Sequence, residues 1–135
     1  MFEFEKNECV IKISPDLEKS KSLFNTSKRT LKFAEKSILD KETAGILLEN
    51  YYEALIEILH SHSCKKGFKI LDHKTFVEYI AEIFASKTYA ELFDKYRRIR
   101  NSIIYYGKLT ELGIAKQGIK DIKEIIKFIE DNFEK

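Results

Sequence analysis

The segment RRIRNSIIYYG, at positions 97–107, gathers three arginines, one asparagine and two tyrosines. Arginine binds phosphate through two parallel hydrogen bonds, and asparagine adds both a donor and an acceptor. From Lys95 to Lys108 there are five basic residues and no acidic residue. We therefore predict phosphate binding by Arg97, Arg100 and Asn101. Basic residues near a helix C-terminus also complement the helix dipole, so a purely structural role stays open.

A helix through this segment has one apolar seam with alternating spacings of four and three residues. The seam residues are Leu92, Tyr96, Ile99, Ile103 and Tyr106. With that seam in the core, Arg100 lies about 80° from its centre. Phe93, Ile104 and Tyr105 then fall on the outer face among the arginines. An apolar and basic outer face is typical of a protein interface, so we predict a homodimer that uses these three residues.

Histidine and cysteine at positions 60, 62 and 64 (HSHSC) invite comparison with a metal site. Helical residues two apart point about 200° from one another, whereas ligands on one helix are spaced by three or four. We therefore predict no metal, with His62 in the core and His60 on the surface. His73 follows Asp72, which we interpret as a helix cap, and we interpret His73 as part of that turn.

Composition predicts one globular domain over residues 1–135, with a short extended or irregular segment at 1–13. The chain has 44% hydrophobic residues, a single proline and a net charge of +2. The sparse turn residues favour a few long elements, and the small net charge gives no sign of a nucleic-acid partner. The N-terminal residues show neither a signal peptide nor a transmembrane span, and two cysteines fit reduced thiols in the cytoplasm.

Helical periodicity predicts an all-α, antiparallel up-and-down bundle of four to five helices. The first helix starts with Ser14 as its cap and carries a seven-residue stripe of Leu17, Phe24, Leu31 and Ile38. The second opens at Asp40, ends at Gly67 and has a wide apolar face that places it centrally. The third runs from a cap at Asp72 to about Phe84. The fourth runs from Ser86 or Thr88 to Tyr106, and the fifth carries Ile119, Ile122, Ile125, Ile126, Ile129 and Phe133.

The helix order and the segment RNSIIYYG together resemble the HEPN family (higher eukaryote and prokaryote nucleotide-binding domains). Its late-helix motif is arginine, commonly asparagine, four to six residues and then histidine. Residues 49–76, with YYEAL and GFKILDH, also resemble archaeal members. The resemblance covers roughly residues 15–133 and places Arg100 and Asn101 at the motif, with Tyr105 where the histidine is expected.

The resemblance implies a dimer with facing motifs that binds RNA or a nucleotide, without a cofactor, near Arg97, Arg100, Asn101 and Tyr52. In active members the arginine and histidine form a metal-independent endoribonuclease, often a toxin neutralised by a nucleotidyltransferase antitoxin. Arg100 and Tyr105 would be the corresponding catalytic residues. Tyrosine, with a pKa near 10, is a poor general base, so the sequence favours binding over cleavage. Two alternatives stay open, a ribonuclease toxin and a subunit that docks a nucleotidyltransferase.

Overall fold

The computed structural model describes residues 1–106 and 109–135, without the side chains of Tyr105 and Tyr106. It is an all-α bundle, as the periodicity predicts, and it also has one small antiparallel ribbon. The elements are a 3-10 helix η1 (Glu3–Lys6), strand β1 (Val10–Lys12), helices α1 (Leu17–Glu35) and α2 (Ala44–Lys66), strand β2 (Phe68–Ile70), and helices α3 (Thr75–Ile83), α4 (Lys87–Tyr106) and α5 (Leu112–Asp131).

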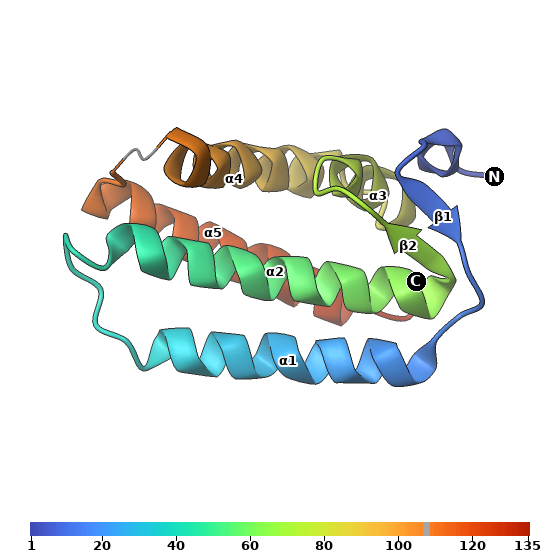
Figure 1. Cartoon of the computed structure of the whole chain (residues 1–135), viewed down its shortest axis with the longest axis horizontal. Coiled ribbons are helices and arrows are strands. Elements are labelled where there is room, and N and C mark those ends of the chain that lie inside the picture. Colours follow the sequence, from blue (N-terminus) through green and yellow to red (C-terminus); the bar gives the residue numbers. More distant parts are fainter. Residues whose placement is uncertain (107–108) are drawn as a thin grey trace.

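The four long helices α1, α2, α4 and α5 run up and down in alternating directions (Figure 1). Helix α2 is central and contacts α1, α4, α5 and strand β2. Helix α3, the ribbon and η1 gather at the end of the bundle where α2 finishes and α4 starts (Figure 1). The short elements therefore cap one end of the bundle and place the β2–α3 loop beside α4.

Helix α2 is central because nearly every face of it is apolar, as expected for a helix surrounded by others. Residues on this wide apolar face are buried: Leu47, Leu48, Tyr51, Tyr52, Ala54, Leu55, Ile58, Leu59 and His62. The helix ends at Gly67 with φ of 91°, a left-handed conformation that glycine adopts without the clash a Cβ would bring. The end predicted for this helix is therefore confirmed.

Among the predicted capping residues, Ser86 is confirmed at the start of α4, whereas Asp72 lies two residues before Lys74, the cap position of α3. The other two differ. Asp72 accepts a hydrogen bond from the Thr75 amide at 3.0 Å, and Ser86 accepts one from Tyr89 at 3.1 Å. The cap of α1 is Asp16, and Ser14 was the wrong choice. Asp40 does not open α2. Its carboxylate instead stabilises a turn by accepting amide hydrogen bonds from the two residues before Ala44, where the helix starts.

The seven-residue stripe of α1 is only half correct. Leu31 is buried and Phe24 is half-buried, but Leu17 and Ile38 are 65% and 79% exposed. Leu17 is the first residue of α1, and Ile38 lies beyond its last residue. The middle of α1 instead approaches α2 through buried serines, with Ser27 donating a hydrogen bond to the Ala54 carbonyl at 2.7 Å. Small polar residues thus take positions that a hydrophobic pattern does not reveal.

Part of the segment 1–13, which was predicted to be extended or irregular, forms the strand β1. It pairs antiparallel with β2, whose residues had given no strand signal, in the register Val10 opposite Ile70. Phe68 and Ile70 are buried and Lys69 is exposed, so β2 does alternate. Three residues are too few for this alternation to be distinguished from chance.

Helix α4 is rotated relative to the predicted seam. Phe93 is fully buried and stacks on Tyr52 of α2, with ring centroids 5.9 Å apart. Tyr96 is also buried and donates a hydrogen bond to Asp121 of α5 at 2.5 Å. Leu92, Ile99 and Ile103 are only half-buried, and Tyr106 lies outside the described side chains. The prediction that Phe93 faces a dimer partner was therefore wrong, because α2 and α3 cover that face of α4.

Candidate phosphate-binding site

A polar pocket of about 390 Å³ lies between α4 and the β2–α3 loop. Arg97, Arg100 and Asn101 line it from α4, and Asp72, His73 and Lys74 line it from the loop. Arg100 is seven residues after Phe93, so helical geometry turns the two side chains about 20° apart on one face. The burial of Phe93 therefore also directs Arg100 inward. The structure thus brings together the three residues predicted to bind phosphate.

Arg100 is held against the core without an ionic partner in the described part of the chain. Its guanidinium carbon lies 5.6 Å from the centroid of the Tyr52 ring, within range of a cation–π interaction. Its Nε is buried and has no hydrogen-bond partner among the described residues. A buried donor without a partner costs free energy, so this guanidinium is suited to receive an anion.

The other two arginines of the segment are already paired. Asp94, one turn earlier on α4, contacts Arg97 at 2.8 Å and Arg98 at 2.5 Å. Hydrogen bonds from both arginines hold the pKa of Asp94 below its usual value, although burial opposes this. Asp94 lies one residue before the acid-free stretch from Lys95 to Lys108, so that stretch alone did not indicate this pairing. Of the two arginines that line the pocket, Arg100 is consequently the one without an ionic partner among the described residues.

His73 is the residue that sequence reasoning missed. Its Nδ1 lies 3.0 Å from the hydroxyl of Tyr52, and its ring lines the pocket beside Arg100. Burial and then Arg100 lower its pKa, while Asp72 opposes them, so the imidazole is neutral at pH 7. A signal was present, because His73 follows the predicted cap at Asp72 inside the segment with family resemblance, but we interpreted it only as part of the turn.

The donor and acceptor roles in the Tyr52–His73 hydrogen bond depend on which imidazole nitrogen carries the proton. Burial raises the pKa of Tyr52, against the opposing effect of Arg100, so the phenol keeps its proton at neutral pH. A phenol beside a cation is a strong donor, and we assign the hydrogen bond as donated from Tyr52 to Nδ1. The Nε2 of His73 then carries a hydrogen, which is the arrangement for binding an anion.

The remaining predicted site residues differ in position. Tyr52 is 1% exposed and contacts both Arg100 and His73, but it does not itself line the pocket. Ile104 is 40% exposed, as expected for an outer position. The side chain of Tyr105 lies outside the described residues, and so do Gly107 and Lys108. The predicted catalytic pair of Arg100 and Tyr105 is therefore represented by Arg100 alone.

The residues of HSHSC are spread over different surroundings. His62 is fully buried, with Nδ1 2.6 Å from the Tyr79 hydroxyl. His60 is half-buried and packs edge-on against Phe76 at 4.9 Å, so its predicted surface position was only partly right. Within residues 1–106 and 109–135, no group of three or more histidine, cysteine or acidic residues is arranged to hold a metal ion.

Comparisons with known proteins leave the site to be judged on its own chemistry. No protein-family model matches the chain, and neither the curated proteins nor the solved structures contain a significant match to it. Among the described residues, no helix is both long and apolar enough to cross a membrane.

Proposed function

We propose that this chain binds RNA or a nucleotide by a phosphate group in the pocket of His73, Arg97, Arg100 and Asn101. One observation carries the proposal, the buried Nε of Arg100 that has no partner among the described residues. A phosphate oxygen can accept a hydrogen bond from this nitrogen and a second from the same guanidinium. The HEPN resemblance, which rests on Arg100 and Asn101, supports the same function independently of this geometry.

The charge balance of the pocket supports an anionic ligand. Lys74, Arg97 and Arg100 outnumber the one acidic lining residue, Asp72. Asp72 is engaged by the Thr75 amide and hydroxyl at the start of α3. Hydrogen bonds from Thr75 and Cys9 hold its pKa below the usual value in spite of burial. The Asp72 carboxylate is therefore ionised and already hydrogen-bonded to Thr75. A phosphate in the pocket would instead contact the Arg100 guanidinium and the His73 N–H.

Replacing Arg100 by alanine is expected to weaken RNA binding about tenfold or more, because a charge-assisted pair of hydrogen bonds is lost. The salt dependence should also change, since one fewer phosphate contact lowers the slope of log K against log salt by about 0.7 for a single strand. Fluorescence anisotropy of a labelled single-stranded RNA, with AMP as competitor, measures both quantities.

Arg98→Ala is the matched control for that experiment. Arg98 lies in the same basic segment and pairs with Asp94, but it does not line the pocket. Its loss should leave RNA affinity nearly unchanged, and Arg100→Lys should recover only part of the affinity because lysine lacks the planar fork. Equal losses in the Arg98 and Arg100 alanine variants would reject the pocket as the site.

Metal-independent RNA cleavage is the second candidate, and the position of His73 favours it. In this reaction the 2′-oxygen attacks phosphorus as its proton leaves to a base, and the P–O5′ bond breaks. The products are a 2′,3′-cyclic phosphate and a 5′-oxygen, which takes a proton from water to become a 5′-hydroxyl. As a base, His73 would need the other tautomer from the one assigned above for anion binding, with Nδ1–H donating to the Tyr52 oxygen and Nε2 free to accept the proton. RNA incubated with chelator should then give cyclic-phosphate ends with the parent protein and none with His73→Ala. Intact RNA under these conditions leaves binding as the function.

A homodimer forms part of the proposal, with Ile104 as its described contact residue. Ile104 is 40% exposed next to the arginines, whereas Phe93 is excluded by its burial. An aspartate at this position should raise the dimer dissociation constant by about tenfold or more, since a charge would be buried in an apolar contact. Sedimentation equilibrium of Ile104→Asp tests this. Ser102→Asp is the control, because a residue two positions earlier points to the other side of the helix. A parent protein that is monomeric at all concentrations would contradict it.

The resemblance further implies a nucleotidyltransferase partner in a cytoplasmic toxin–antitoxin system, and this part of the proposal rests on the resemblance alone. Co-purification of the chain from its native host is the test. Recovery of the chain without any nucleotidyltransferase would count against that partner but would not affect the phosphate pocket.

A further inference from the structure

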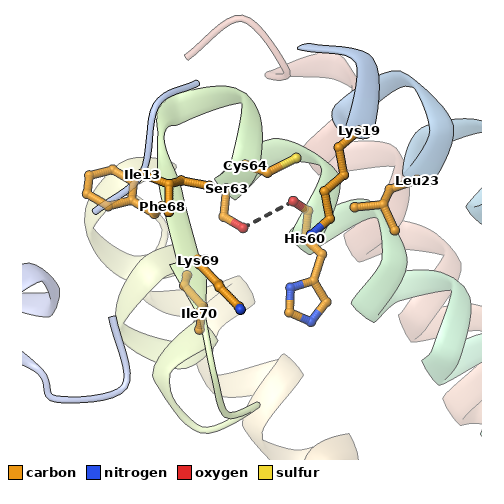
Figure 2. Close-up of a pocket in the computed structure, with 9 residues that line it drawn as sticks. All are labelled: Ile13, Lys19, Leu23, His60, Ser63, Cys64, Phe68, Lys69 and Ile70. Carbon is orange, nitrogen blue, oxygen red and sulfur yellow. Dashed lines mark hydrogen bonds between the residues drawn. The ribbon is translucent and has the colours of Figure 1, made fainter. Parts of the chain in front are cut away.

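A second cavity, of about 270 Å³, lies between α1, the end of α2 and strand β2. Its walls are largely apolar, and its lining residues are Ile13, Lys19, Leu23, His60, Ser63, Cys64, Phe68, Lys69 and Ile70 (Figure 2). None of them lines the phosphate pocket. The cavity is slightly smaller than typical ligand sites, whose volumes start at about 300 Å³.

The polar groups of this cavity are basic or neutral, and no acidic residue lines it. Figure 2 shows the side chains of Lys19 and Lys69 extending toward the His60 ring from different elements. Neither lysine takes part in an ion pair within the described part of the chain. Lysines on the exposed face of an edge strand are common, so Lys69 alone would carry little weight.

The position of Lys19 is unfavourable for the helix that carries it. It lies in the first turn of α1, and its backbone amide donates to the capping carboxylate of Asp16 at 2.9 Å. The positive end of the helix dipole disfavours a cation there. Lys19 is an exposed residue of the cavity lining, and an anion bound there would offset this repulsion.

His60 adds a donor inside the cavity. Burial, and then His73 and Lys19, lower its pKa to about 4, so its imidazole is neutral at pH 7 and one ring nitrogen carries a hydrogen. No hydrogen bond to its ring nitrogens is found among the described residues, although its backbone carbonyl accepts one from Ser63 at 3.1 Å (Figure 2). A neutral imidazole between two lysines matches the acceptor oxygens of a carboxylate.

We infer that this cavity binds a small organic anion, with its carboxylate at Lys19, Lys69 and His60 and a short apolar body against Leu23, Phe68 and Ile70. The ligand class follows from the two features together, since burial of the apolar body supplies free energy and the lysines select for negative charge. This site is separate from the proposed phosphate pocket, so either one can fail without the other.

Hexanoate is a suitable probe, with hexanol as its neutral counterpart. In methyl-labelled full-length protein, hexanoate at millimolar concentration should give saturable shifts of the Ile13, Leu23 and Ile70 methyl resonances. Hexanol should bind about tenfold more weakly, because it lacks the charge that the lysines recognise. The double variant Lys19→Gln/Lys69→Gln should lose about tenfold in hexanoate affinity for the same reason.

Two further variants make the outcome decisive. Lys21→Gln removes an exposed lysine of α1 that does not line the cavity, and it should bind hexanoate like the parent protein. Leu23→Trp places a large ring on the cavity wall and should abolish the methyl shifts of Ile13 and Ile70. The inference is overturned if hexanoate gives no saturable shift, if hexanol binds equally well, or if the double variant keeps the parent affinity.

Discussion

Lowering the pH from 7 toward 4 is expected to remove several kcal/mol of folding stability through the buried histidines. Burial lowers the pKa of both His60 and His62 to about 4, from 6.5. Between pH 6.5 and 4, both histidines are therefore protonated in the unfolded chain but neutral in the folded chain. Stability is fully present above pH 6.5 and is lost as the pH falls, by up to about 3 kcal/mol for each histidine.

Urea unfolding at a series of pH values measures this slope. Between pH 6.5 and 5 each such histidine should contribute about 1.4 kcal/mol per pH unit. His62→Phe loses its hydrogen bond with Tyr79 and should be less stable at pH 7, but its pH slope should be smaller by one proton. An identical slope in the parent and in His62→Phe would show that His62 is not buried in its neutral form.

Phe93→Ala is expected to destabilise the fold by about 3–5 kcal/mol, the usual cost of removing a buried aromatic ring. Phe93 is completely buried and stacks on Tyr52, so its removal leaves a cavity between α2 and α4. The same cavity would loosen Tyr52, which contacts Arg100 and His73. We therefore expect weaker RNA binding together with the lower free energy of unfolding.

Ile104→Ala, on the same helix, is the control for that measurement. Ile104 is 40% exposed, and its truncation should cost less than about 1 kcal/mol. Chemical denaturation of both variants at one protein concentration separates the two positions. Similar small losses in both would support the original helical-wheel assignment, in which Phe93 faces outward.

Most of the fold follows from sequence periodicity and helix ends. The wide apolar face of α2, its Gly67 terminus and the helix-start hydrogen bonds of Asp72 and Ser86 are local signals that structural context does not override. The ribbon was only half predicted, because three-residue strands carry too little pattern and their pairing is a long-range event. The failed stripe of α1 has a similar cause, since only tertiary contacts decide how much of a helix is covered.

The site was predictable in composition but not in orientation. Arg97, Arg100 and Asn101 stand out as a basic cluster, and the structure does place them in one pocket. Helix α4 is covered on one side by α2 and α3 and on another side by α5. A helical wheel drawn with a single apolar seam cannot show two covered sides. The approach of His73 depends on where the β2–α3 loop crosses α4, which no spacing in the sequence specifies.

The central claim is that Arg100 offers an unused donor to a phosphate. The most direct measurement follows the side-chain Nε–H resonance of Arg100 in ¹⁵N-labelled protein, assigned with Arg100→Lys, during titration with AMP or single-stranded RNA. We predict a saturable shift of this resonance at the same ligand concentration as the binding isotherm, while the Nε–H of Arg98 moves little. An Arg100 resonance that stays fixed while RNA binds elsewhere would contradict the account.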